Sequence, residues 1–184
     1  MFETIKSKVL DENGLKRLRE KYPHKKIVFA TGCYDILQSG HAVFFSQCKT
    51  YGDLLVVGVG RDHVIEQLKG PGRPVNPENN RVYLVASMQD VDFATLNSPE
   101  LSEGKTDFMN VLTQLKPDVF VINDDDSALE FKKQLCERLG ITPALVSRSV
   151  PEELLATSTT NIINKINYAF RAPLRIDFAG GWTD

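Results

Sequence analysis

Cysteine and long apolar runs are scarce in this sequence, and each scarcity excludes a class of protein. The 184 residues include only three cysteines, Cys33, Cys48 and Cys136, and no Cys-x-x-Cys pair. An odd number of widely spaced cysteines argues against a disulfide framework or a zinc site and is typical of a reduced thiol environment. No window approaches the roughly 20 apolar residues of a transmembrane helix, and residues 1–14 contain no apolar signal-peptide core. We therefore expect a cytoplasmic protein with no membrane partner.

An excess of charge of one sign is also missing. Lysine and arginine together number 22 against 24 aspartates and glutamates, which leaves a formal net charge of −2. Domains that bind nucleic acid or anionic membranes usually carry a basic excess, so we expect no nucleic-acid partner. The length suffices for one domain with a substantial core.

Short apolar runs alternate with segments of helical periodicity along most of the chain. The runs predict buried strands at residues 26–30, 53–60, 91–96, 117–122 and 142–147. Helices are predicted at residues 11–22, 81–88, 107–115, 129–139 and 158–168. This alternation indicates a Rossmann-like, doubly wound α/β fold with a parallel five-stranded sheet. Such sheets bind ligands beyond the carboxyl ends of their strands, near the switch point of the strand order.

The turn after the first predicted strand, ATGCYDILQSGHAVFF at residues 30–45, has the features of an anion site. Gly32 and Gly40 permit close approach of the backbone, and Ser39 or Gly40 can cap a helix whose apolar side carries Val43, Phe44 and Cys48. A helix start presents unpaired N–H groups and the positive end of the helix dipole. His41 would add a donor there, so the pattern predicts a phosphate site. An ordinary turn with a core or surface histidine is the alternative.

Other side chains suited to binding phosphate lie further along the chain. They are Lys69, Arg73, Arg81, Ser158, Thr159 and Thr160. Residues 70–80 are rich in Gly, Pro and Asn, which predicts a long functional loop. Taken singly, such lysines and arginines are more often solvated loop charges, and the Ser/Thr cluster is also an ordinary helix cap.

Three motifs, in this order, resemble those of the cytidylyltransferase-like nucleotidyltransferases. GCYDILQSGH (32–41) resembles the family signature G-x-F-D-x-x-H-x-G-H. LKGPGRPVNPENNR (68–81) resembles L-K-G-x-G-R-P-x-N-P-x-x-x-R of the ADP-heptose synthase type, and ATSTTNIINKI (156–166) resembles the closing S-T-T-x-I-I-x-x-I. Glycerol-3-phosphate cytidylyltransferase is a more distant relative. The resemblance implies transfer of a nucleotidyl group from an NTP (CTP or ATP) to a sugar phosphate, with Mg²⁺ accompanying the triphosphate.

The resemblance also implies roles for individual residues. His41 and Lys69 would act in catalysis, together with Gln38. Nucleotide and phosphate would be bound by Thr31, Gly32, Cys33, Tyr34, Gly40, Arg73, Arg81, Asp124, Ser158, Thr159 and Thr160. Asp35 would tie down its loop, and no protein metal ligand is expected. Asp124 and Asp125 would reach the base and sugar pocket, with an exposed acidic turn as the alternative.

Two departures from the family pattern bear on activity. Gln38 stands where members usually have histidine, and because glutamine cannot become cationic, stabilisation of transition-state charge should weaken. VINDDD (121–126) stands where the heptose enzymes have V-K-G-G-D, so a lysine is missing. Three readings remain: an active enzyme with Gln38 as a neutral donor, a degenerate module that only binds nucleotide, or an adenylyltransferase for a non-sugar phosphate.

The end of the sequence carries a second resemblance. RAPLRIDFAGGWTD (171–184) resembles the opening strand of GHMP-family sugar kinases of the fucokinase or heptose-7-phosphate kinase kind. We therefore expect a helical lead-in at 1–25, a nucleotidyltransferase domain at 26–168 and the start of a truncated kinase domain at 169–184. The chain would then be part of a bifunctional sugar kinase and nucleotidyltransferase. A strand that merely completes the first domain is the alternative, and a homodimer is compatible with the family.

Overall fold

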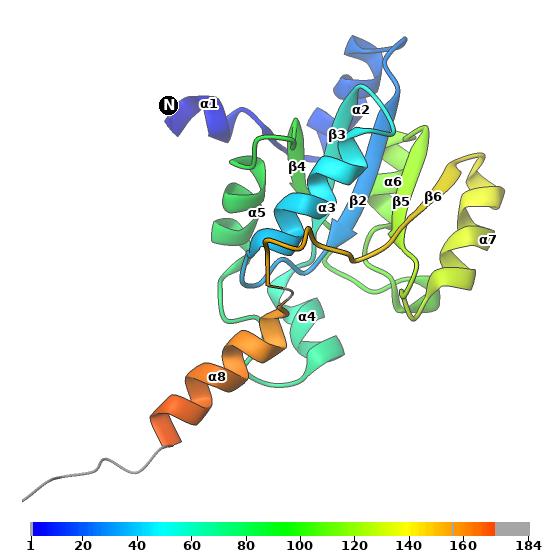
Figure 1. Ribbon diagram of the computed structural model, residues 1–184. Helices are drawn as coiled ribbons and strands as arrows, with labels where there is room; N and C mark the ends of the chain where they lie inside the picture. The colour runs from blue at the N-terminus through cyan, green and yellow to red at the C-terminus, as the bar shows by residue number, and fades with distance from the viewer. Residues whose placement is uncertain (1, 156, 172–184) are drawn as a thin grey trace, which may run out of the picture.

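Six parallel strands form the sheet at the centre of the computed structural model, which describes residues 2–155 and 157–171 (Figure 1). The strands are β1 (Val9–Leu10), β2 (Ile27–Gly32), β3 (Leu54–Val59), β4 (Phe93–Leu96), β5 (Val119–Asn123) and β6 (Thr142–Val146). Their order across the sheet is β1-β4-β3-β2-β5-β6, and every neighbouring pair is parallel. The predicted fold class is confirmed, but the predicted number of five strands was wrong. The strand that was not predicted, β1, lies at the edge of the sheet and has only two residues, too few to show a periodicity.

Eight α-helices and one 3-10 turn are formed by the described residues. They are α1 (Phe2–Lys6), α2 (Glu12–Lys21), α3 (Ser39–Lys49), α4 (Asp62–Lys69), α5 (Glu78–Ala86), η1 (Glu103–Lys105), α6 (Met109–Leu115), α7 (Leu129–Leu139) and α8 (Thr159–Arg171). All predicted helices are present; α4 was not predicted, and α1 lies in the helical lead-in expected at 1–25 without having been named as a helix. None of these helices is both long and apolar enough to cross a bilayer. The kinase-like resemblance at 171–184 falls almost wholly outside the described residues and stays a prediction.

The sheet is covered on both faces, which explains why its strands appear as unbroken apolar runs. Val28 and Ala30 of β2 belong to one core with α3 and α5, while Ile27 and Phe29 belong to the other with α2, α6 and α7. In Figure 1, α3 crosses in front of the strands and α2 and α6 lie behind them. Because successive side chains of a strand point to opposite faces of the sheet, each strand contributes to two separate cores.

Helix α3 differs in detail from its prediction. Its N-cap is Gln38, whose Oε1 accepts a hydrogen bond from the Gly40 N–H at 2.5 Å, rather than Ser39 or Gly40. Its fully buried side chains are Phe45 and Cys48, while Val43 and Phe44 are only partly buried. Glutamine is not among the favoured N-cap residues, so capping preference pointed to the wrong position.

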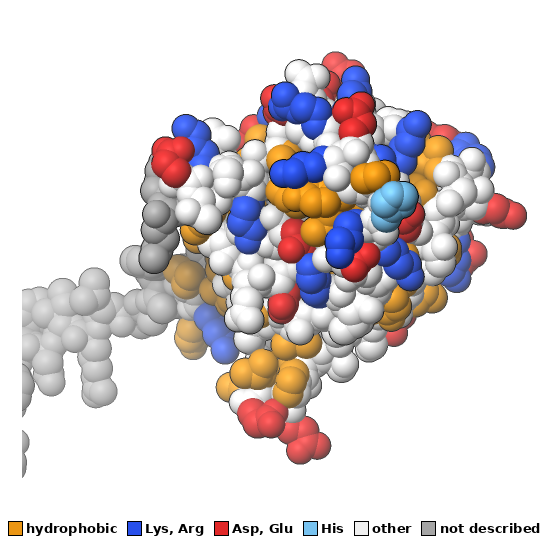
Figure 2. Space-filling view, turned by 90° about the horizontal axis from the view of Figure 1, so that it is seen from above, with side chains coloured by type: hydrophobic (Ala, Val, Ile, Leu, Met, Phe, Trp, Pro, Cys, Tyr) orange, Lys and Arg blue, Asp and Glu red, His pale blue; other side chains and the backbone are white. Residues whose placement is uncertain are grey.

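The strand order places a switch point beside β2. From β2 the chain proceeds outward through β3 and β4, then returns to place β5 on the other side of β2. Segments leaving β2 and β5 therefore diverge, which opens a crevice at the carboxyl ends of the strands. Figure 2 looks onto the opposite, amino-terminal ends, where basic and acidic side chains lie interspersed, so that face presents no field of a single sign.

Gly58 of β3 is predicted to be essential for stability. A Cβ at this position would collide with the Asn97 side-chain oxygen and come within 3.0 Å of the Phe29 ring. We expect Gly58→Ala to lower the free energy of unfolding by about 1–3 kcal/mol, measured from the urea midpoint, because the core must shift to accept the methyl group. Asn79→Ala, on the exposed side of α5, is the control and should change stability by less than about 0.5 kcal/mol. Equal midpoints for the two variants would contradict this packing.

Candidate functional site

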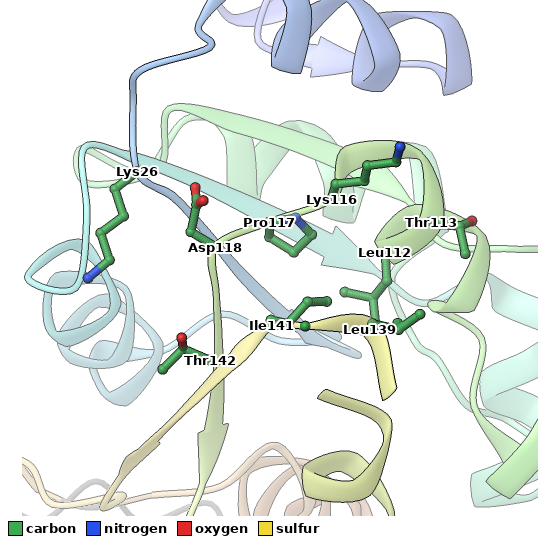
Figure 3. Close-up of a pocket in the computed structure, with 10 residues that line it drawn as sticks. Lys26, Leu112, Thr113, Lys116, Pro117, Asp118, Leu139, Ile141 and Thr142 are labelled. Atoms are coloured by element: carbon green, nitrogen blue, oxygen red, sulfur yellow. The ribbon is translucent and has the colours of Figure 1, made fainter. Parts of the chain in front are cut away.

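A cavity of about 830 Å³ lies at the carboxyl ends of the strands. Its wall combines the turn after β2, the starts of α3 and α8, the end of α4 and the residues that follow β4, β5 and β6. A second cavity, of about 620 Å³, lies at the amino ends, where Figure 3 shows Asp118 and Lys26 at the starts of two strands. Asp118 there accepts hydrogen bonds from Ile27 N and Arg19, so its charge serves the framework. The first cavity is the candidate site, because its position is that of ligand sites in doubly wound sheets.

The turn after β2 brings the predicted backbone cradle to the cavity wall. Thr31, Gly32, Cys33 and Tyr34 all line the cavity. Tyr34 has a left-handed φ of 49°, and its ring packs edge-on against the His41 ring with centroids 5.4 Å apart. A Cβ on Gly32 would lie 2.9 Å from the Tyr34 ring, so glycine is required for the turn to fold this way. Burial raises the pKa of Tyr34 well above its ordinary value, so the phenol stays neutral and acts mainly in packing.

His41 is held as a neutral hydrogen-bond donor. Its Nδ1 accepts a hydrogen bond from the Gln38 N–H at 3.2 Å, which leaves the proton of the neutral ring on Nε2. Burial lowers the pKa of His41, and the positive charges of Arg148 and Lys69 lower it further. The ring lines the cavity and can offer one N–H there.

Gln38 is used differently from its prediction as a free donor to phosphate. Its Oε1 caps α3, and its Nε2 donates to the Thr157 carbonyl at 3.0 Å. Thr159 Oγ1 also donates to the Ile36 carbonyl, at 3.3 Å. These two contacts hold Thr157 and the start of α8 against the residues that lead into α3. The Gln38 amide is therefore a link between distant segments of the site.

The predicted hydroxyl cluster does reach the cavity. Ser158, Thr159 and Thr160 all line it, beside Gly40 and His41 of α3. Ser158 Oγ also accepts from the Asn161 N–H at 3.1 Å, so the residue caps its own helix as well. The structure thus brings together two predicted motifs that lie more than a hundred residues apart in the sequence.

Asp35 ties down the Gly- and Pro-rich loop, as predicted. Its buried carboxylate accepts from Arg73 Nε at 2.9 Å and from the Val75 and Asn76 N–H groups at 2.8 and 3.0 Å. Arg73 lines the cavity, but this ion pair fixes one edge of its guanidinium. Much of its charge is therefore already neutralised by Asp35.

Arg81 is a correction, because it does not face the cavity. Its side chain is fully buried, and it donates to the Asn76 carbonyl at 2.7 Å, the Cys33 carbonyl at 2.6 Å and Asp62 Oδ1 at 2.6 Å. Helix α5 begins at Glu78, three residues earlier than the predicted start. Arg81 therefore lies within the helix, where it faces the protein interior. Its expected contact with phosphate is wrong.

Lys69 is the predicted cation that is available to a ligand. It is exposed at the end of α4 and lines the cavity, and no ion pair to it occurs within residues 2–155 and 157–171. Its charge acts on both His41 and Cys33, which places it beside the turn after β2. Burial raises the pKa of the Cys33 thiol, so Cys33 contributes backbone rather than a thiolate.

The role of Asp124 in nucleotide binding stays a prediction. Asp124 is exposed and lies outside the cavity lining, whereas its neighbours Asn123 and Asp126 belong to it. The Asp124 N–H bonds to the Val146 carbonyl at 2.9 Å, so the backbone continues the pairing of β5 with β6. Asp125 pairs with Arg148 at 2.8 Å. Part of the acidic turn is thus solvent-exposed, and one of its members turns into the cavity.

Several cavity residues were missed by sequence reasoning. They are Asn97, Asp107, Asn123, Lys132 and Arg148. Asn97 directly follows β4 and Asn123 ends β5, so the rule that sites lie at carboxyl ends could have found both. The other three lie on loops or on a helix face and carry no comparable signal. Among the described residues, no group of three or more His, Cys, Asp or Glu side chains is placed to hold a metal ion.

Two curated proteins with similar sequences are named Bifunctional protein HldE. The Bifunctional protein HldE of Campylobacter fetus is 33% identical over 172 residues, which are 89% of this chain and 34% of that protein. The Bifunctional protein HldE of Helicobacter pylori strain P12 is 34% identical over 127 residues, 66% of this chain and 26% of that protein. The chain therefore spans about a quarter to a third of the length of these relatives.

Solved structures show the same fold. The lipopolysaccharide core biosynthesis protein from Thermoplasma volcanium superposes with a TM-score of 0.56 at 32% identity, over 70% of this chain and 99% of that one. Pantoate-beta-alanine ligase from Francisella tularensis gives a TM-score of 0.57 over 89% of this chain and 79% of that one. At 18% identity it supports the fold alone.

The Cytidylyltransferase-like family model matches residues 29–165, which include the turn after β2, the Gly- and Pro-rich loop at 70–80 and the start of α8. The chain therefore belongs to the cytidylyltransferase-like family of nucleotidyltransferases.

Proposed function

We propose that this chain transfers a nucleotidyl group from CTP or ATP to a sugar phosphate and releases pyrophosphate. The observation that carries the proposal is the convergence of His41, Lys69 and the 158–160 hydroxyls at one end of the cavity. These donors come from three separate segments and are all suited to phosphate oxygens. The sugar acceptor is supported by the similarity to a protein named for lipopolysaccharide core biosynthesis.

The proposed chemistry requires positioning and charge stabilisation rather than a covalent intermediate. An acceptor phosphate oxygen attacks the α-phosphorus in line, and the bond to the pyrophosphate leaving group breaks. The His41 Nε2–H and the Lys69 ammonium would face the charge that develops on the transferred phosphorus, and the hydroxyls of Ser158 and Thr159 would hold the leaving group.

Mg²⁺ is proposed to arrive with the triphosphate. The described residues present no acidic cluster for it, so phosphate oxygens and water would supply most of its ligands. This fits an ion whose usual sites keep several waters and only one or two protein carboxylates.

A second candidate function is a module that binds nucleotide without turning it over. It is favoured by the Gln38 amide, which is already engaged with the Gly40 N–H and the Thr157 carbonyl. The Gln38 amide would have to leave these partners before it could act on a phosphate. Exposed Lys69 favours the catalytic candidate, because it has no structural partner within the described ranges.

Pyrophosphate release across the four NTPs, each with a panel of sugar 1-phosphates, tests the catalytic proposal. We expect release with CTP or ATP that depends on both the nucleotide and one acceptor class. Nucleotide binding without release for every pair would favour the second candidate. No nucleotide binding at all would contradict both.

Gln38→His tests whether the glutamine limits turnover. A histidine can become cationic and add a charge-assisted donor, so we expect turnover to rise by about tenfold or more, with nucleotide Kd within about threefold. Gln67→His, on the exposed surface of α4, makes the same substitution outside the cavity and should leave both unchanged. A drop in turnover for Gln38→His would show that the link to Thr157 matters more than the missing charge.

The titration of His41 tests the anion site directly. In the free protein its pKa should lie below the ordinary 6.5, because burial and two nearby cations disfavour the charged ring. Since the folded-state pKa is lowered, the neutral ring supports folding above about pH 6.5, and this contribution is lost as the pH falls through the folded pKa. Bound pyrophosphate should raise the pKa, because an anion stabilises the imidazolium. Histidine NMR titration with and without pyrophosphate measures both, and an unmoved His41 pKa would place the anion elsewhere.

A further inference from the structure

The cavity has two ends with different polar groups, and the proposed function uses only one of them. Lys69 and Arg148 bring positive charge to the first end, here called the cationic end, beside the neutral His41 ring. The other end is lined by Asn97, Asp107, Asp126 and Lys132, together with residues 104–106. Phosphate groups are better placed at the cationic end, because at the other end Asp107 and Asp126 offset the charges of Lys105 and Lys132. The Asp107 end therefore calls for a different kind of ligand group.

Asp107 is held in place by the loop that follows β4. Asn97 is 2% exposed, and its Nδ2 donates to Asp107 Oδ1 at 3.1 Å and to Thr31 Oγ1 at 2.9 Å. The Asp107 carbonyl accepts from the Ser98 N–H at 2.7 Å, which closes the loop on itself. The Asp107 side chain is not used to cap α6, whose N-cap is Phe108 with no side-chain cap bond. The loop thus positions the carboxylate at the cavity, where its Oδ1 accepts from the Asn97 amide and its Oδ2 lies beside Gly60.

Space for the second carboxylate oxygen depends on Gly60. A Cβ at Gly60 would lie 3.2 Å from Asp107 Oδ2 and 3.3 Å from Ile65, tighter than most such contacts. Burial raises the pKa of Asp107, against the opposing effects of the Asn97 hydrogen bond and the Lys132 charge. The carboxylate is therefore partly desolvated, which strengthens any hydrogen bond that a ligand donates to it.

Lys132 adds donors at the same end of the cavity. Its side chain is only 12% exposed, and its ammonium pairs with Asp126 at 2.7 Å and lies 5.4 Å from the centre of the Phe108 ring. The ammonium has three N–H donors, and the ion pair with Asp126 uses one. A carboxylate acceptor and an ammonium donor on one wall match a group that both donates and accepts hydrogen bonds, as hydroxyl groups do.

We propose that the Asp107 end of the cavity is the subsite for the hydroxyl-bearing part of the acceptor, whose hydroxyls donate to Asp107. The inference rests on the proposed function for the identity of that acceptor as a sugar phosphate. It makes Asp107 a specificity determinant: acceptors without hydroxyl groups at this depth should bind more weakly, because they would cover the partly buried carboxylate without donating a hydrogen bond to it.

Binding measured by NMR on the ¹⁵N-labelled chain tests the subsite. The probes are α-D-mannose 1-phosphate, α-D-glucose 1-phosphate and inorganic phosphate. We expect at least one sugar phosphate to shift the signals of Asp107 and the Asn97 side-chain amide, while inorganic phosphate shifts only signals near His41 and Lys69. Asp107→Asn should weaken binding of that sugar phosphate by about tenfold or more, because the charged acceptor is lost. Its affinity for inorganic phosphate should stay within about twofold.

Glu100→Gln is the matched control, because it removes one charge from an exposed position of the same loop. Equal sugar phosphate affinity in Asp107→Asn and the wild type, or no probe that reaches the Asp107 and Asn97 signals, would overturn the inference. The chemical shift changes of the wild type decide the matter even if the variant folds poorly.

Pyrophosphate release on the same samples separates the subsite proposal from the catalytic proposal. Binding at Asp107 without release would uphold the subsite and refute catalysis, whereas release with an unchanged acceptor KM in Asp107→Asn would refute the subsite alone.

Discussion

The buried guanidinium of Arg81 is the contact on which the rest of this site depends. A charge with no solvent exposure is tolerated only when its donors are satisfied, and here two carbonyls and the Asp62 carboxylate satisfy them. Those partners lie in the turn after β2, in the loop before α5 and at the start of α4. One side chain therefore joins three segments that are separate in the sequence. Removal of any partner would leave a buried charge or a buried carbonyl unpaired.

A second ion pair extends this framework and divides the basic residues by role. Asp35 takes Arg73 and two backbone N–H groups of the loop, so two of the three cations in the loop motif serve the architecture. Lys69 is the third, and it stays exposed at the cavity rim. The loop can thus be ordered by buried pairs and still present one free ammonium. The turn after β2, the end of α4 and the start of α8 all line the cavity beyond the carboxyl ends of the strands, the side of the sheet on which α8 lies in Figure 1.

Individual residues show where sequence reasoning succeeded and where it did not. The place of His41 and of the 158–160 hydroxyls followed from motifs whose backbone geometry is local, a helix start after a strand. Asp35 was correctly predicted to tie down its loop. The expected phosphate contact of Arg81 failed because α5 begins three residues earlier than predicted, so this side chain faces the interior. Gln38 was recognised as unusual, but its bond to Thr157 crosses more than a hundred residues, and no local pattern reports such a contact.

The sequence by itself determined the alternation of strands and helices, the parallel sheet and the family, because these follow from apolar periodicity and short contiguous motifs. Only the tertiary structure decided which polar groups line the cavity and which are paired with other protein groups in the interior. Asn97 and Asp107 lie in the loop after β4 and Lys132 lies in α7, and these two segments meet only once the sheet has its order and the loop has closed. The physical reason is that burial and charge pairing are properties of the assembled chain. An arginine can bind a ligand from an exposed position or hold segments together from a buried one, and its position in the sequence does not distinguish the two.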